Sequence, residues 1–219
     1  MPILPVTAAS LARAASALRR GGIVAFPTET VYGLAVDAGN PAAVDALRAL
    51  KGREENKPFQ VLVPSLKEAE KLAHFNPEAA RLAGAFWPGA LTLVLPRRAT
   101  AKTGIGVPTL GLRCPDHEAT QALLAAFGKP LAATSANPAG AAAAVTAEGV
   151  VSGFRFRVSG VMGTGSPSSI LHPPSSDFLI LDGGACRIGL ASTVVECTGG
   201  NFRILREGAI SAASLAAYR

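Results

Sequence analysis

Long apolar runs, paired cysteines and clustered histidines are all missing from this chain of 219 residues. Apolar stretches such as residues 59–63 and 91–95 are far shorter than the roughly 20 residues that cross a bilayer, which excludes a membrane-spanning protein. The three cysteines form no CxxC pair, which argues against a disulfide framework and against a zinc ribbon. The three histidines lack the spacing of metal ligands, so we expect no dedicated protein metal site.

Signatures of the common covalent and nucleotide-binding enzymes are missing as well. The chain has no GxSxG nucleophile elbow, no HExxH zinc motif and no cysteine with a histidine partner in its sequence context. Residues 163–166 superficially resemble a glycine-rich phosphate loop, but we predict neither a strand before them nor a helix after them. Any nucleotide must therefore be held by a different arrangement of residues.

Charge is sparse and biased toward positive residues. Only 16% of the residues are charged, and 21 Lys and Arg against 15 Asp and Glu give a net charge of +6. This balance favours anionic partners such as nucleotides, phosphates or nucleic acid. With 49% hydrophobic residues the chain can bury a core, and we expect a single domain over residues 1–219.

The compartment is indicated only indirectly. Unpaired cysteines fit a reducing compartment, so we expect a cytoplasmic protein. The first 28 residues contain arginines and no acid, which also permits an organelle transit peptide. However, Thr7 can cap an amphipathic helix that ends at Gly21 and Gly22, which favours folded structure for this stretch.

Strand and helix signals alternate along the chain, which predicts an α/β fold. Helices are expected after the capping residues Thr7, Asn40, Ser65 and Asn76, over residues 118–127, and after Ser211. Strands are expected at residues 23–26, 59–63, 91–95, 111–113, 131–134, 178–181, 193–197 and 202–205, with a loop between residue 26 and Asn40. Several late strands follow one another without room for a crossover helix, so the sheet is predicted to be mixed.

Residues 140–176 differ from the rest, with an alanine run followed by repeated Gly, Ser and Pro. We expect a long loop or insertion at this position. Within it, Phe and Arg alternate over residues 154–158, which predicts an exposed strand at a hairpin edge. The same alternation is also compatible with stacking on nucleic-acid bases.

Short polar clusters follow the predicted strands, where α/β proteins bind ligands. The clusters are residues 27–34, Lys51 with Arg53 and Lys57, Thr109 with Arg113, residues 134–137, Ser192 with Thr193, and Arg206. Cations from three separate segments are what a triphosphate site without a P-loop requires, since guanidinium groups bind phosphate oxygens bidentately. Each cluster also has a plain structural interpretation as a helix end, a turn or a cap. As exposed site charges, Lys51 and Arg206 are expected to contribute to activity and little to stability.

Seven sequence blocks carry a resemblance to a known family. They are Pro27-Thr-Glu-Thr-Val-Tyr-Gly-Leu34, Lys51-x-Arg53, Trp87-Pro-Gly-Ala-Leu-Thr92, Leu112-Arg-x-Pro115, Ser135-Ala-Asn137, Ser192-Thr-Val-Val195 and Leu205-Arg-x-Gly208. In this order they resemble the YrdC/TsaC-type threonylcarbamoyl-AMP synthase family in its single-domain form. The resemblance covers about residues 7–215 apart from 140–176. It implies an α/β fold with a single-domain twisted mixed β-sheet, flanking helices and a concave basic cleft.

The resemblance also implies an activity. Members of this family make L-threonylcarbamoyladenylate and pyrophosphate from L-threonine, bicarbonate or CO₂, and ATP, for threonylcarbamoyladenosine modification of tRNA. Implied partners are these substrates, a downstream threonylcarbamoyl-transferase complex and tRNA itself, and Mg²⁺ is expected to arrive with ATP.

The resemblance further implies roles for individual residues. Lys51 and Arg53 would be catalytic. The implied ATP ligands are Arg53, Lys57, Thr109, Ser135, Asn137 and Arg206. The implied L-threonine ligands are Thr30, Arg113, Ala133 and Ser192. Arg113 is expected to grip the amino-acid carboxylate with two hydrogen bonds, because a planar fork matches a planar anion.

Two departures and two alternatives remain. Leu62 stands where some family members place a histidine, and the alanines of residues 141–144 stand near where an ATP-contacting serine is common.

A noncatalytic RNA-binding module is the first alternative, and threonine-dependent pyrophosphate release distinguishes the synthase from it. A carbamoyl-transfer domain like that of hydrogenase-maturation proteins is the second, and it would use carbamoyl phosphate in place of bicarbonate.

Overall fold

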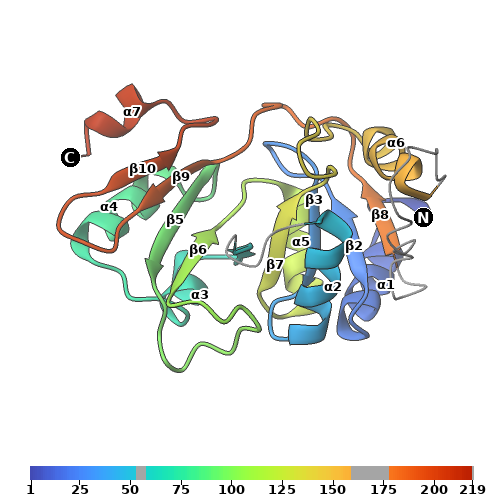
Figure 1. Cartoon of the computed structure of the whole chain (residues 1–219), viewed down its shortest axis with the longest axis horizontal. Coiled ribbons are helices and arrows are strands. Elements are labelled where there is room, and N and C mark those ends of the chain that lie inside the picture. The colour runs from blue at the N-terminus through green and yellow to red at the C-terminus, as the bar shows by residue number, and fades with distance from the viewer. Residues whose placement is uncertain (53–57, 159–177, 219) are drawn as a thin grey trace, which may run out of the picture.

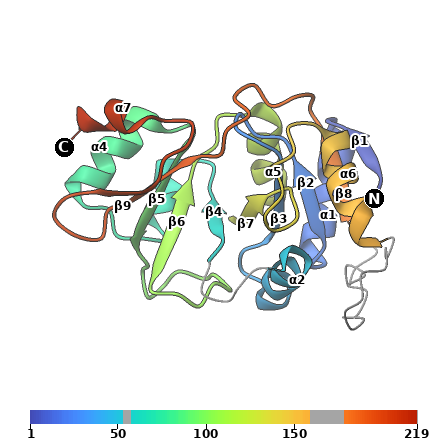
Figure 2. The ribbon, with the colours of Figure 1, turned by 45° about the horizontal axis from the view of Figure 1, so that its top comes forward.

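The computed structural model describes residues 1–52, 58–158 and 178–218. In these residues ten strands form one sheet, which twists from one end to the other (Figures 1 and 2). The strands are β1 (Ile3–Pro5), β2 (Ile23–Phe26), β3 (Gly33–Asp37), β4 (Gln60–Leu62), β5 (Leu91–Pro96), β6 (Thr109–Arg113), β7 (Leu131–Ser135), β8 (Phe178–Asp182), β9 (Thr193–Glu196) and β10 (Arg203–Arg206). Their order across the sheet is β1-β8-β2-β3-β7-β4-β6-β5-β9-β10.

Parallel and antiparallel pairs both occur in this sheet. β8 runs parallel to β1 and β2, β4 runs parallel to β6, and β5 runs parallel to β9. The other neighbouring strands are antiparallel. The predicted mixed sheet is therefore confirmed.

All the described helices except Ala147–Val158 begin where the sequence predicts them. They are α1 (Ala8–Arg19), α2 (Pro41–Lys51), α3 (Leu66–Glu70), α4 (Pro77–Phe86), α5 (Glu118–Phe127), α6 (Ala147–Val158) and α7 (Ala212–Ala216). Thr7, Asn40, Ser65 and Asn76 each accept a hydrogen bond from a backbone N–H in the first turn of the helix that follows. Such caps satisfy N–H groups that have no partner inside the helix.

One face of the sheet is covered along its whole length and the other only at one end. On the first face, α2, α3, α4, α6 and α7 share one core with strand residues such as Leu34 and Leu93. On the second face, α1 and α5 pack over β8, β2, β3 and β7 through residues such as Leu18 and Leu124. The core on this second face contains no described residue of β5, β6, β9 or β10. This half of the sheet is therefore open to a ligand.

Two strands and one helix differ from the expectations. β1 and β3 were not expected. All five residues of β3 are buried, so the alternation that identifies a half-exposed strand is lost. The predicted strand at residues 154–158 is wrong, because these residues end α6 and Phe154 is buried edge-on against Phe178. The expected loop is also wrong for residues 147–153, which form the start of α6, whereas residues 159–176, including 163–166, lie outside the described residues.

A long connection, residues 183–192, joins the two ends of the sheet. In Figure 1 it runs from the orange β8 along the upper edge to the red β9. We call it the strap. The backbone N–H groups of Ile188 and Gly189 donate to the carbonyl oxygens of Glu29 and Thr30 at 3.0 and 2.9 Å. The strap is thereby tied to the loop between β2 and β3.

None of the helices in the described ranges has both the length and the apolar character needed to cross a membrane.

Candidate active site

A cavity of about 430 Å³ lies on the open half of the sheet. Its floor is formed by strand side chains such as Leu62, Val94 and Arg113. Part of its wall comes from the loop between β2 and β3, and another part comes from the end of the strap together with the end of β10. The volume suits a small organic ligand.

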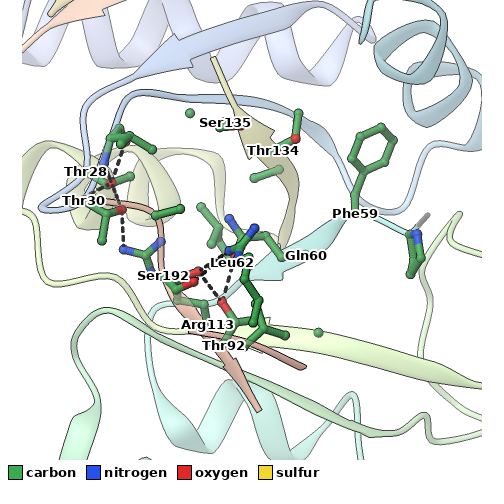
Figure 3. A pocket seen from close by; sticks show the side chains of 18 of the residues that line it. Thr28, Thr30, Phe59, Gln60, Leu62, Thr92, Arg113, Thr134, Ser135 and Ser192 are labelled. Atoms are coloured by element: carbon green, nitrogen blue, oxygen red, sulfur yellow. Dashed lines mark hydrogen bonds between the residues drawn. The ribbon is translucent and has the colours of Figure 1, made fainter. Parts of the chain in front are cut away.

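Most of the predicted ligand residues meet in this cavity, several of them labelled in Figure 3. The predicted residues that line it are Thr30, Thr109, Arg113, Ala133, Ser135, Ser192 and Arg206. Lys51 and Asn137 reach the same region through hydrogen bonds to or from Ser135. Arg53 and Lys57 lie outside the described residues.

Arg113 is the best-anchored cation of the cavity. It lies at the end of β6, and only 3% of the residue is exposed. Its Nη2 donates to Glu29 Oε1 at 2.7 Å and to Thr30 Oγ1 at 2.9 Å, and its Nε donates to the Gly89 carbonyl at 3.1 Å. Among the described residues Nη1 has no partner. Without a change in these contacts, a ligand carboxylate has only Nη1 available, so the expected two-bond grip would need a second donor from elsewhere.

Arg206 is the second cation that lines the cavity. Its Nη2 donates to the backbone carbonyl of Ser192 at 2.7 Å. Burial against the wall and the positive charge of Arg113 both lower the pKa of Arg206 from its ordinary value. Both guanidinium groups line the same cavity, an arrangement suited to anions.

The local fold explains why two of the sequence blocks belong together. Thr193 is fully buried, and its Oγ1 accepts hydrogen bonds from the N–H groups of Gly208 and Ile210 at 2.9 Å each. A Cβ on Gly208 would collide with the Ala191 carbonyl and stand 2.8 Å from the Ser192 carbonyl. Glycine is therefore required for the segment after β10 to lie against the start of β9, which fixes Arg206 beside Ser192.

Lys51 lies behind the cavity wall at the end of α2. Its ammonium group donates to the Ser135 carbonyl at 2.7 Å, to Asn137 Oδ1 at 3.1 Å and to the Asn137 carbonyl. Ser135 Oγ in turn donates to Asn137 Oδ1 at 2.6 Å. The expectation of an exposed charge is wrong for Lys51, since only 4% of the residue is exposed.

Hydroxyl groups form two hydrogen-bonded sets around the arginines (Figure 3). Thr28 and Thr30 share a hydrogen bond of 2.7 Å on the loop between β2 and β3. Thr92 on β5 is bonded to Ser192 at 2.9 Å and donates to Gln60 Oε1 at 3.1 Å. Both sets present neutral donors and acceptors to the cavity.

Sequence reasoning missed several residues of the site. Gln60, Thr92 and Glu196 line the cavity. Which face of the sheet each of these side chains occupies depends on the strand register, which the sequence does not show. Glu29 belongs to the block of residues 27–34 but was given no role, yet its carboxylate pairs with Arg113 and only 1% of the residue is exposed. An acid next to a threonine-rich turn was the available signal.

Metal ligands are not clustered in the described part of the chain. No group of three or more His, Cys, Asp or Glu side chains there is placed to hold a metal ion. Glu196 is the carboxylate among the described cavity-lining residues, and Arg203 pairs with it at 2.7 Å.

Comparison with known proteins gives consistent matches. The family model of the Sua5/YciO/YrdC proteins, described as "Telomere recombination", matches residues 16–208. The threonylcarbamoyl-AMP synthase of Bacillus subtilis is 38% identical over 205 residues, which cover 92% of this chain and 54% of the relative. That of Bos taurus is 35% identical over 211 residues, covering 91% of this chain and 68% of the relative.

Solved structures agree with the fold. The crystal structure of Pyrococcus abyssi Sua5 complexed with L-threonine matches with a TM-score of 0.83 and 33% identity, over 100% of this chain and 61% of that one. The Escherichia coli YciO structure matches with a TM-score of 0.76 and 21% identity, which supports the fold alone. The chain spans about half the length of the Bacillus subtilis and Pyrococcus abyssi synthases, 54% and 53% of them. The family model and these identities confirm the resemblance, and the chain belongs to the Sua5/YciO/YrdC family.

Proposed function

We propose that the protein is an L-threonylcarbamoyladenylate synthase. The observation that carries this proposal is the pair Arg113 and Arg206, which face one cavity among neutral hydroxyl groups. The sequence has no GxSxG nucleophile elbow, and two arginines line the cavity. These features suit a reaction that brings two anions together without a protein nucleophile. The names of the relatives favour this function over the RNA-binding alternative.

In the proposed reaction the amine of L-threonine attacks CO₂ and loses a proton, which gives a carbamate. A carbamate oxygen then attacks the α-phosphorus of ATP, and the bond to the β-phosphate breaks so that pyrophosphate leaves. No protein nucleophile is needed, because positioning and charge neutralisation are the main contributions of a protein to phosphoryl chemistry.

The cavity-lining residues support a division of the two substrates between two groups of residues. Arg113 and Thr30, on the side of the loop between β2 and β3, would hold the L-threonine carboxylate together with Ser192 and the backbone at Ala133. Arg206, Thr109 and the Ser135–Asn137 turn would hold ATP, with Lys51 supporting that turn. Arg53 and Lys57 complete the set that the resemblance implies for ATP.

Partners and the metal ion follow from the same proposal. Because the described carboxylates form no metal cluster, Mg²⁺ would enter with the ATP phosphates, which are its usual ligands. The product would be consumed by a threonylcarbamoyl-transferase complex that acts on tRNA. The three free cysteines support a cytoplasmic setting for this exchange.

The test is pyrophosphate release by the purified protein with ATP, Mg²⁺ and bicarbonate. Release should require L-threonine and should be much lower with L-serine. Carbamoyl phosphate in place of bicarbonate should not support release. Folded protein that binds ATP but releases no pyrophosphate when L-threonine is added would contradict the proposal.

A further inference from the structure

The two arginines of the cavity differ in how their charges are compensated. Arg113 is paired with the carboxylate of Glu29 at 2.7 Å, and the two side chains are 3% and 2% exposed. The hydrogen bonds of Arg206 go to the carbonyl and the hydroxyl of Ser192, both uncharged. No carboxylate of the described residues pairs with Arg206. One guanidinium is thus locally neutralised and the other keeps its full charge.

Charge compensation changes which anion a guanidinium binds best. A buried ion pair has little net charge, so its long-range attraction for a polyanion is mostly cancelled. Its unused N–H groups still donate directional hydrogen bonds to a single carboxylate. An uncompensated guanidinium attracts a polyanion such as a triphosphate far more strongly than it attracts a zwitterion.

We propose that Glu29 determines which substrate each arginine takes: its buried carboxylate reserves Arg113 for the carboxylate of the amino acid and leaves the phosphates to Arg206. The inference rests on the proposed function, since it names the residue that keeps the two substrates of that reaction apart. Glu29 acts through Arg113 and is a specificity-determining residue that lies behind the cavity wall.

The loop around Glu29 is held without the carboxylate. Thr28 Oγ1 accepts from the N–H groups of Thr30 and Val31 and donates to the Val31 carbonyl at 2.7 Å. The strap donates to the carbonyls of Glu29 and Thr30. Changing the carboxylate therefore changes the charge beside Arg113 while the backbone keeps these bonds.

The substitution Glu29→Gln isolates that charge. Glutamine keeps an oxygen that can accept from Arg113, as Oε1 does now. It replaces Oε2, a buried atom without a hydrogen-bond partner among the described residues, by an amide nitrogen. A matched control is Asp37→Asn, because Asp37 is also largely buried, is paired with Lys129 at 3.4 Å, and lies at the far end of β3 from the cavity.

The first experiment uses the unchanged protein and inorganic phosphate as the probe. Phosphate should compete with ATP in calorimetric titrations and should leave the affinity for L-threonine unchanged. Competition of phosphate with L-threonine in the unchanged protein would overturn the proposal, and this arm needs no variant to fold.

The second experiment measures the dissociation constant of phosphate for Glu29→Gln. We expect it to fall by about tenfold, the effect of one uncompensated charge in a partly screened site, and to change little in Asp37→Asn. Adding Arg113→Gln to Glu29→Gln should abolish the gain. A carboxylate with a merely structural role would weaken the binding of phosphate and L-threonine together, and that result would also refute the proposal.

These outcomes are separable from those of the proposed function. If the unchanged protein releases no pyrophosphate with L-threonine, the proposed reaction fails whatever the phosphate titrations show. If it releases pyrophosphate but Glu29→Gln binds phosphate as the unchanged protein does, only the inference about Glu29 fails.

Discussion

The ammonium nitrogen of Lys51 lies 2.7 Å from the backbone carbonyl oxygen of Ser135, although 84 residues separate the two in the sequence. This hydrogen bond joins the end of α2 to the end of β7 behind the cavity wall. A lysine at a helix end also offsets the negative end of the helix dipole. We therefore expect the charge of Lys51 to contribute both to the stability of the fold and to the binding of anions in the cavity.

Replacing Lys51 by methionine should cost both stability and ATP binding. The side chain keeps its length, but the oxygens of Ser135 and Asn137 lose a buried charged donor, which costs about 1–3 kcal/mol of the free energy of unfolding. Urea denaturation and ATP titration measure the two effects. Lys71→Met is the control, because Lys71 is 61% exposed in its pair with Glu68 and should change stability by less than about 0.5 kcal/mol. Equal stability of both variants would contradict this account.

Alanine at Gly208 should be far more damaging than alanine at Gly84. The first Cβ would meet the backbone of Ala191 and Ser192, so the segment after β10 must move and Arg206 with it. We expect a loss of about 2–4 kcal/mol together with weaker ATP binding. Gly84 is an exposed residue inside α4 with nothing within 4 Å of its Cβ position, so alanine there should add about 0.5–1 kcal/mol. Thermal unfolding of the two variants measures both effects, and similar melting temperatures for Gly208→Ala and Gly84→Ala would contradict this prediction.

Lysine in place of Arg113 should damage the site although it keeps the charge. A single ammonium cannot reach Glu29, Thr30 and the Gly89 carbonyl in the geometry that the guanidinium uses. The affinity for L-threonine should fall by about tenfold or more, while the affinity for ATP changes less. Isothermal titration with each substrate measures both, and an unchanged affinity for L-threonine would remove Arg113 from its proposed role.

Stability should depend on pH through His117. Burial lowers the pKa of His117 below its ordinary value of 6.5, despite the nearby Glu29, and its Nδ1 is buried without a partner among the described residues. As the pH falls below about 6.5, the unfolded chain takes up this proton before the folded chain does, so stability is lost. Well above that pH the imidazole is neutral in both states and contributes no such dependence.

The measurement for His117 is urea denaturation of the unchanged protein and of His117→Gln between about pH 7 and pH 5. The unchanged protein should lose more stability over this interval than the variant. Other titrating groups affect both proteins alike, so the difference between the two curves belongs to His117. Parallel curves would show that the imidazole titrates alike in the folded and unfolded chains.

Local signals predicted the helices well. Thr7, Asn40, Ser65 and Asn76 act as caps in the structure because a cap is a contact within one turn of the chain. β3 and α6 escaped prediction for opposite reasons. β3 is buried on both faces and shows no alternation, whereas the apparent alternation near Phe154 belongs to a helix whose packing against Phe178 decides its conformation.

The sequence predicted which residues belong to the candidate site, but it did not predict their burial or their contacts with one another. The blocks gave Arg113, Ser192 and Arg206, and the structure brings them to one cavity. The burial of Lys51 and the pairing of Glu29 with Arg113 depend on contacts 84 residues apart in the chain, which no local pattern contains. Long-range pairing also decides which residues of β4 and β5 face the cavity.

The strap has a consequence for synthesis. The ribosome makes a protein from its N-terminal side. The strands β1 and β2 therefore leave the ribosome before β8, and they can pair with it only after Phe178–Asp182 has emerged. Until β9 follows, the edge of β5 has no parallel partner and neither Ser192 nor Arg206 is present. Pairings this distant in sequence form slowly, because the entropy of closing the intervening loop must be lost first. The cavity can therefore be completed only after β9 and β10 have been made, because Ser192 and Arg206 line it.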